Sequence, residues 1–251
     1  MNVNDFYNKE FNENDRLSGT DNRHKVELYR KHFMYSKLID KYMPKKIVQI
    51  SCGTGIHTHW LCEHYPNIEI YASDIIPKHV EQLKNYPNLY KRVWNCCDEL
   101  LEEYLDADIV IVEGAWYHLI RPDRYKLIDN LLRIMPNIIT IDWLSAWHDT
   151  TQRILQNKKV PMNYRNPRPN EPFVFDTVDD LTGICTTQFY DIQLFPVDMD
   201  LRFGYTDLNQ VNDEEFIKYI NLMNEYIGFY PSTETFIMNT TEHGCYILSR
   251  K

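Results

Sequence analysis

Residues 47–55 read Ile-Val-Gln-Ile-Ser-Cys-Gly-Thr-Gly, and this stretch decides the fold of the chain. Its first half is rich in β-branched apolar side chains, which is typical of a strand buried on both faces of a parallel sheet. Gly53 and Gly55 follow, and glycine lets the backbone turn tightly and approach a ligand that a Cβ atom would keep away. The stretch therefore predicts a strand, a tight turn and the start of a helix, with a ligand against the turn.

An acidic residue, Asp74, ends a second apolar segment, residues 68–73. It lies about twenty residues after the glycine turn, where a doubly wound sheet presents a carboxylate to the two hydroxyls of a bound ribose. Asp74 is therefore predicted to bind a nucleotide sugar. The alternative is that Gly53 and Gly55 only form a tight strand-to-helix turn, with no ligand.

The composition of the turn indicates which nucleotide fits. The dinucleotide fingerprint needs a third glycine at the position of Thr58, and no Lys or Arg lies within the turn to help hold a pyrophosphate. This pattern disfavours NAD. A ligand that carries ribose and adenine without a phosphate fits better, and S-adenosylmethionine is the common one.

With these features the chain resembles the class I S-adenosylmethionine-dependent methyltransferases. Residues 53–55 correspond to the first motif of that family, and Asp74 corresponds to its ribose-binding acid. Residues 97–99, Cys-Asp-Glu, correspond to a short acidic motif that meets the adenine after the third strand. Residues 106–119 resemble the fourth strand and its loop, which ends in Tyr-His-Leu.

The two ends of the chain resemble one bacterial branch of this family. Residues 14–17 and 25–27 are similar to its opening segments, and residues 242–251 are similar to its final strand. The resemblance implies that Arg16 and Glu27 close the cofactor pocket, although surface ion pairs would leave the same pattern.

One departure from the family pattern concerns the turn itself. Ser51 and Cys52 stand where the family usually has an acidic and a small residue before Gly53, and that acid orients the glycine loop or the amino group of the cofactor. The resemblance implies S-adenosylmethionine as the cofactor, with S-adenosylhomocysteine as its product. The implied binding residues are Arg16, Glu27, Ser51, Gly53, Gly55, Asp74, Ile75, Cys97, Asp98, Glu99, Glu113 and Gly114.

Alternating strand and helix patterns predict an α/β fold with a Rossmann-like, doubly wound, mostly parallel seven-stranded sheet whose last strand is antiparallel. The expected strands are residues 47–51, 68–73, 89–94, 108–113, 138–142, 189–195 and 244–249. The expected helices are residues 22–42, 56–64, 77–84 and 122–134. We expect one domain, residues 1–251. It comprises an N-terminal helical segment (1–44), a cofactor-binding core (45–147) and two lid or cap insertions (148–175 and 196–240).

Composition narrows the function. The chain of 251 residues has a net charge of −9, which gives no broad cationic surface for nonspecific nucleic-acid binding. A small-molecule methyl acceptor is therefore expected. No apolar run reaches the length of about twenty residues that a membrane span needs, and residues 1–5 do not resemble a secretion signal, so we expect a cytoplasmic protein. The six cysteines are irregularly spaced and are expected to be reduced thiols.

The catalytic candidates are Tyr117 and His118, which follow the predicted fourth strand. His118 is placed to accept a proton from a hydroxyl or amine nucleophile, or else it is a hydrogen-bonded structural histidine. No metal site is predicted, because a helix would direct His57 and Cys62 to different sides and no second ligand pair appears elsewhere. Two other function classes stay open: a non-catalytic S-adenosylmethionine- or nucleoside-binding protein and a nucleotide-dependent oxidoreductase.

Overall fold

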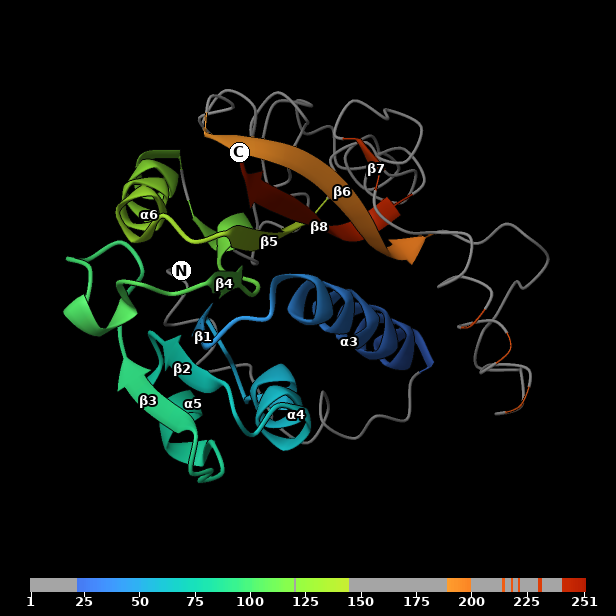
Figure 1. Cartoon of the computed structure of the whole chain (residues 1–251), viewed down its shortest axis with the longest axis horizontal. Helices are drawn as coiled ribbons and strands as arrows, with labels where there is room; N and C mark the ends of the chain where they lie inside the picture. Colours follow the sequence, from blue (N-terminus) through green and yellow to red (C-terminus); the bar gives the residue numbers. More distant parts are fainter. Residues whose placement is uncertain are drawn as a thin grey trace, which may run out of the picture.

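A computed structural model describes residues 22–119, 121–144, 189–199 and 241–251, together with Glu214, Lys218, Asn221, Tyr230 and Pro231. Its centre is one sheet in which eight strands follow the order β3-β2-β1-β4-β5-β8-β6-β7 (Figure 1). The strands are β1 (Lys46–Ile50), β2 (Glu69–Asp74), β3 (Leu89–Val93), β4 (Ile109–Val112), β5 (Ile138–Leu144), β6 (Tyr190–Met199), β7 (Tyr230–Pro231) and β8 (Thr241–Arg250).

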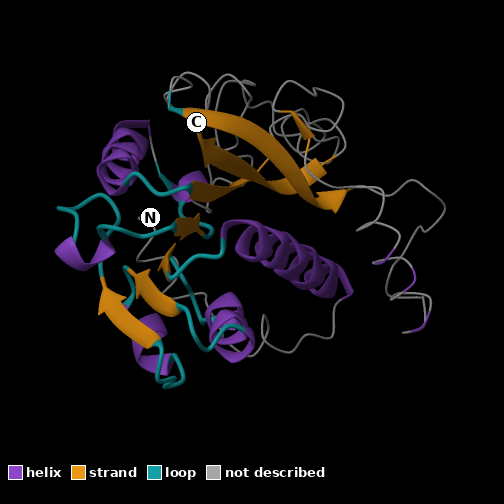
Figure 2. Ribbon diagram, in the orientation of Figure 1, coloured by secondary structure: helices purple, strands orange, loops and turns teal. Residues whose placement is uncertain are grey.

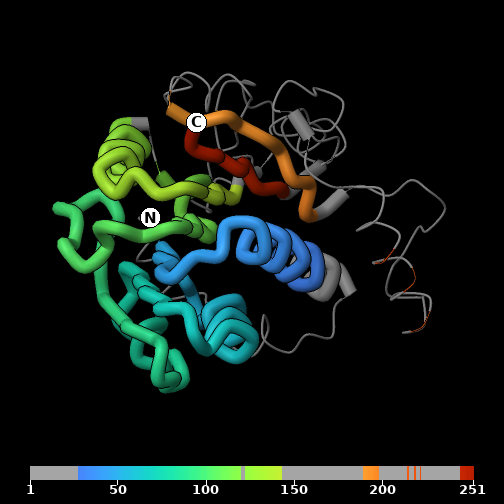
Figure 3. Tube along the Cα trace, viewed as in Figure 1, coloured from blue at the N-terminus to red at the C-terminus, as the bar shows by residue number. Residues whose placement is uncertain are grey.

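The first five strands pair in parallel, and β8 inserts between β5 and β6 as an antiparallel strand. Figure 3 shows this C-terminal strand, in red, beside β6, in orange. The predicted seven-stranded, mostly parallel sheet with an antiparallel last strand is therefore confirmed. The two-residue strand β7 was not predicted. It adds an eighth strand at the β6 edge, and so short a segment carries no readable periodicity.

Helices cover both faces of the sheet (Figure 2). They are α3 (Asn22–Tyr42), α4 (Ile56–His64), α5 (Pro77–Gln82) and α6 (Arg121–Ile134), and two short 3-10 turns, η1 (Glu102–Tyr104) and η2 (Trp116–His118), follow β3 and β4. Helix α5 ends two residues earlier than predicted. Its next residue, Leu83, turns to extended backbone and packs into a buried cluster with Cys52 and Ala72.

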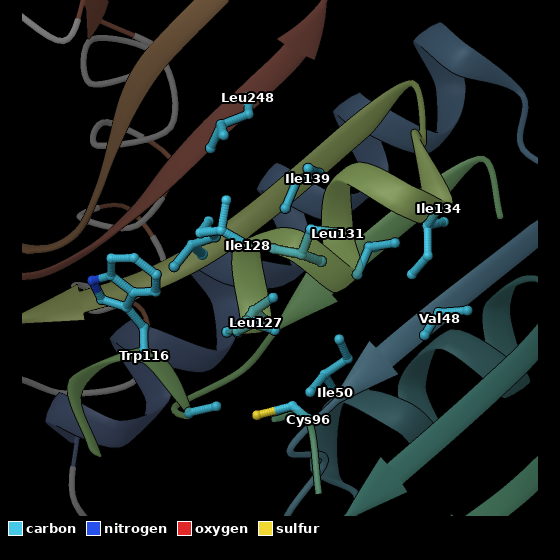
Figure 4. Close-up of a cluster of buried hydrophobic side chains, with 14 of the residues drawn as sticks. Val48, Ile50, Cys96, Trp116, Leu127, Ile128, Leu131, Ile134, Ile139 and Leu248 are labelled. Atoms are coloured by element: carbon cyan, nitrogen blue, oxygen red, sulfur yellow. The ribbon is translucent and has the colours of Figure 1, made fainter. Parts of the chain in front are cut away.

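Successive residues of the central strands bury alternately against the two helical layers. On β4, Ile109 and Ile111 pack with α3 and α4, whereas Val110 and Val112 pack with α6. Figure 4 shows the α6 layer, in which Leu127 and Leu131 lie over the sheet. Burying such a side chain stabilises the fold by about 1.5–3 kcal/mol. Strands with apolar residues on both faces therefore contribute strongly to the stability of the core.

The insertions predicted at residues 148–175 and 196–240 lie largely outside the described residues. The second begins later than predicted, because β6 continues to Met199. Among the described helices, none combines the length and the apolar character that crossing a bilayer requires.

Candidate cofactor and active site

The carboxyl ends of β3, β2, β1 and β4 lie next to one another and carry most of the predicted site. Backbone hydrogen bonds continue beyond the strands, from Cys52 N to Ser73 O at 2.9 Å and from Glu113 N to Ile50 O at 2.9 Å. Because neighbouring parallel strands end at the same edge, the glycine turn, Asp74 and the segments after β3 and β4 come together there.

Three residues of the glycine turn have positive φ angles: Ser51 at 60°, Gly53 at 54° and Gly55 at 84°. The two glycines differ in what surrounds them. A Cβ atom on Gly55 would lie 2.2 Å from Leu83 Cδ2, whereas one on Gly53 would have no heavy atom within 4 Å in the described structure. Glycine is favoured at 55 by its left-handed φ and by the little room beside Leu83, whereas Gly53 leaves open space that a ligand can approach.

Asp74 ends β2 with a carboxylate that is only 4% exposed. Its Oδ2 accepts a hydrogen bond from Gly53 N at 2.8 Å, and its Oδ1 accepts one from Ile76 N at 2.9 Å. His79 Nδ1 lies 3.3 Å from Oδ1. The carboxylate thus links the glycine turn to the start of α5, while the next residue, Ile75, is 37% exposed at the same edge.

The segment after β3 presents Cys97 half-buried and Asp98 and Glu99 exposed. Its backbone is held from α6, because Asn130 Nδ2 donates to Cys96 O at 3.0 Å and to Asp98 O at 2.8 Å. The carboxylates of Asp98 and Glu99 therefore extend from a fixed loop.

The segment after β4 carries the catalytic candidates on the short turn η2. His118 N donates to Ala115 O at 3.0 Å, and Tyr117 and His118 have ring centroids 4.7 Å apart. Arg124 of α6 holds this turn: its Nε donates to Leu119 O at 3.0 Å, and its guanidinium lies 4.5 Å from the Trp116 ring centroid.

Trp116 is fully buried and belongs to the core on the α6 face (Figure 4). This placement favours a packing role for the indole.

Gly114, two residues before Trp116, has a φ angle of 68°. A Cβ atom at this position would lie 3.0 Å from the Tyr117 hydroxyl oxygen. Glycine at 114 therefore suits the left-handed backbone and leaves room for the Tyr117 hydroxyl.

Glu113 collects hydrogen bonds from three elements. Lys31 of α3 donates to Oε1 at 2.7 Å, and Tyr35 of α3 and Gln49 of β1 donate to Oε2 at 3.2 and 3.1 Å. His57 Nε2, in the first turn of α4, lies 3.1 Å from Oε1. Burial alone would raise the pKa of the Glu113 carboxyl, but His57 and Lys31 hold that pKa well below its usual range.

Asp142 of β5 completes this buried cluster, because its Oδ2 accepts a second hydrogen bond from Lys31 Nζ at 2.6 Å. Its Oδ1 accepts a hydrogen bond from the Cys245 thiol at 2.9 Å, and burial raises the pKa of that thiol. Sequence reasoning singled out neither Lys31 nor Asp142. The available signal was helical spacing, since positions 31, 34, 35 and 38 share the face of α3 that meets the sheet.

Two predicted binding residues are not placed in full. Arg16 lies outside the described residues, and Glu27 is described only as part of the backbone of α3, one turn before Lys31. Ser51 begins the glycine turn but has no carboxylate. The carboxylate that lies beside the first turn of α4 is that of Glu113.

The side chains that could bind a metal have different partners. His59 accepts a hydrogen bond from Lys84 N, and His64 Nδ1 contacts Trp60 O. Across the described segments, no group of three or more His, Cys, Asp or Glu residues is arranged to hold a metal ion.

No protein-family model matches the chain. One curated relative, malonyl-[acyl-carrier protein] O-methyltransferase of Anoxybacillus flavithermus, is 30% identical over 109 residues. Those residues make up 43% of this chain and 41% of that protein, so the chain matches about two fifths of the length of its relative.

Solved structures share the fold over most of the chain. A SAM-dependent methyltransferase from Archaeoglobus fulgidus aligns with a TM-score of 0.50 and 16% identity, covering 88% of this chain and 94% of that one. The plantazolicin methyltransferase BpumL, solved with SAH, aligns with a TM-score of 0.57 and 13% identity, covering 98% and 93%. The small RNA methyltransferase HEN1 aligns with a TM-score of 0.57 and 14% identity, covering 92% of this chain and 25% of that chain. The sheet order, the glycine turn and these alignments together show that the chain has the class I fold of S-adenosylmethionine-dependent methyltransferases.

Proposed function

We propose that this protein is an S-adenosylmethionine-dependent methyltransferase that transfers a methyl group to an oxygen, nitrogen or sulfur atom of a small molecule. The observation that carries the proposal is the contact between Gly53 N and the Asp74 carboxylate at the carboxyl edge of a class I sheet. This contact places an open glycine turn beside a buried acid, as binding of a nucleoside with an aminoacyl tail requires. The SAH-bound plantazolicin methyltransferase supports the same cofactor.

The residues at this edge fit such a cofactor. Gly53 leaves room at the turn, and the Asp74 carboxylate has about four lone-pair sites for the two backbone N–H donors of Gly53 and Ile76, so it retains capacity for two ribose hydroxyls. Ile75 offers an exposed apolar surface, and the loop after β3 offers carboxylates for an adenine amino group. The proposed binding set is that of the sequence prediction: Arg16, Glu27, Ser51, Gly53, Gly55, Asp74, Ile75, Cys97, Asp98, Glu99, Glu113 and Gly114.

When bound, the cofactor supplies a methyl group on a sulfonium, and the protein must align the acceptor with that methyl group and exclude water. The residues proposed to do so lie on η2 after β4, at the edge next to the glycine turn. His118 takes the proton from a hydroxyl or amine acceptor, and Tyr117 shapes the same side of the site.

The small-molecule acceptor is the finer part of the proposal. The names of the relatives differ in acceptor, from plantazolicin to malonyl-[acyl-carrier protein] and small RNA, and the fold does not choose among them. The net charge of −9 argues against an extended phosphate backbone as the acceptor. We propose that residues 148–175 and part of residues 196–240 act as lids that set acceptor choice.

An oxidoreductase is disfavoured by the position of Thr58. Its side chain is fully buried, and its hydroxyl donates to Gln49 Oε1 at 2.7 Å, so it fills the contact between helix and strand where a dinucleotide-binding fold would have glycine for close packing. Only a measurement of turnover distinguishes an enzyme from a non-catalytic binding protein.

Calorimetry with S-adenosylmethionine and S-adenosylhomocysteine tests the proposal first. We expect dissociation constants well below millimolar for both. Incubation with small hydroxyl, amine and thiol compounds, followed by assay of released S-adenosylhomocysteine, then tests catalysis. Binding with no turnover on any acceptor class would favour the non-catalytic alternative, and absence of binding would refute both.

The two glycines of the turn provide a matched pair of variants. Gly55→Ala is expected to lower the free energy of unfolding by about 2–4 kcal/mol, because its Cβ combines a left-handed φ with overlap against Leu83. Gly53→Ala is expected to lower it by only about 1–2 kcal/mol, since its Cβ meets open space. We nevertheless expect Gly53→Ala to weaken S-adenosylhomocysteine binding at least about tenfold, which corresponds to about 1.4 kcal/mol. Unchanged affinity of a folded Gly53→Ala protein would show that the ligand does not approach this turn.

A further inference from the structure

Lys31, Glu113 and Asp142 form a buried cluster that contains more contacts than are needed to pair one lysine with an opposite charge. Lys31 is 1% exposed and pairs with both carboxylates, that of Glu113 directly after β4 and that of Asp142 in the second half of β5. A buried ammonium needs such partners, because unpaired burial of a charge is strongly unfavourable. Asp142 accepts hydrogen bonds from Lys31 and Cys245, whereas Glu113 is also contacted from β1 and α4.

These additional donors flank the glycine turn. Gln49 lies two residues before Ser51, and His57 lies two residues after Gly55, so one carboxylate holds the chain on both sides of the turn. The amide of Gln49 is itself oriented, because Thr58 Oγ1 donates to its Oε1 at 2.7 Å and leaves Nε2 facing Glu113. The four donors match the roughly four lone-pair sites of a carboxylate.

The same carboxylate fixes α3 against this turn. Lys31 and Tyr35 lie one helical turn apart on α3 and reach its two oxygens. The Glu113 side chain keeps 13% of its surface exposed, and Gly114 directly after it has a positive φ angle, so the carboxylate lies at the boundary between the buried cluster and the open edge of the sheet.

We propose that Glu113 is a positioning residue for the cofactor site: its carboxylate sets the shape of the glycine turn and the place of α3 beside it. The proposal rests on the proposed function and deepens it, because it assigns Glu113 an effect on cofactor affinity through Gln49 and His57. Lys31 also pairs with Asp142 of β5. The segments that border the proposed cofactor and acceptor sites, after β4 and in β5, are therefore held by the same lysine.

A pair of isosteric substitutions tests this role on the full-length protein. Glu113→Gln and Asp142→Asn each remove one negative charge from the surroundings of Lys31, but Glu113 also contacts Gln49 and His57 on the two flanks of the glycine turn. We expect both variants to melt at lower temperature than the wild type. Glu113→Gln is expected to raise the dissociation constant for S-adenosylhomocysteine by about tenfold or more, whereas Asp142→Asn leaves it within about threefold.

Amide hydrogen exchange of the glycine turn separates a local change at the turn from a loss of overall stability. Residues 52–57 are expected to exchange faster in Glu113→Gln than in Asp142→Asn at matched distance below each melting temperature. Equal losses of affinity in the two variants, or wild-type affinity in a folded Glu113→Gln protein, would overturn the proposal.

If Glu113→Gln does not fold, His57→Leu carries the test, because it leaves both partners of Lys31 in place. It is expected to weaken S-adenosylhomocysteine binding at least about fivefold, and unchanged affinity would overturn the positioning role. Wild-type protein that binds neither S-adenosylmethionine nor S-adenosylhomocysteine would refute the proposed function itself, which keeps the two failures distinct.

Discussion

Replacing Asp74 with alanine is expected to weaken binding of S-adenosylhomocysteine by about 10²- to 10⁴-fold. The proposed site uses this carboxylate for two ribose hydroxyls, and each charge-assisted hydrogen bond is worth about 1.5–3 kcal/mol. The structure adds a second reason, because Asp74 Oδ2 also accepts from Gly53 N and so holds the turn that the ligand would approach. Calorimetric titration of wild type and variant measures the loss directly.

Asp108 offers a matched control for this variant. Its Oδ2 accepts backbone hydrogen bonds from Lys45 N at 2.7 Å and Lys46 N at 3.1 Å, at the opposite, amino end of β1. Asp108→Ala therefore removes a similar backbone-capping carboxylate far from the proposed site. We expect it to lower stability while leaving S-adenosylhomocysteine affinity within about threefold. Comparable affinity losses in the two variants would mean that Asp74 acts only through stability.

The fold could be predicted because the amino-acid sequence of its central strands directly indicates burial on both faces of a sheet. Residues 109–112 are Ile-Val-Ile-Val, and burial on both faces of the sheet requires such an uninterrupted apolar run. The glycine turn was predictable as well, because two glycines directly after an apolar strand are a local sequence signal, although the crowding by Leu83 at Gly55 is not. Strand β7 was not, because two residues pair with β6 through tertiary position alone.

The buried cluster shows what a local pattern leaves hidden. Lys31 lies 82 residues from Glu113 and 111 residues from Asp142 in the sequence, so nothing near it indicates two buried carboxylates. A lysine in a helix is usually solvent-exposed, and only its place on the face shared with Met34 and Tyr35 indicates burial. Glu113 was predicted at the cofactor site from the resemblance, but its donors on α3, β1 and α4 follow from the packed structure.

The second large effect is expected at His118, which lies on a turn held by contacts to its backbone. The backbone of η2 is held by hydrogen bonds from His118 N to Ala115 O and from Arg124 to Trp116 O and Leu119 O. None of these contacts uses the imidazole. His118→Ala is therefore expected to fold.

If His118 is the general base, His118→Ala lowers the rate of methyl transfer by about 10²- to 10⁴-fold and leaves cofactor affinity within about threefold, because proton transfer contributes to the transition state and not to cofactor binding. Single-turnover measurement with an acceptor identified from S-adenosylhomocysteine release separates the two quantities. A structural His118 predicts a different pair of results, with the melting temperature and cofactor affinity falling together. A folded variant with near-normal turnover would remove His118 from the mechanism, and alignment of the acceptor with exclusion of water would then account for the rate.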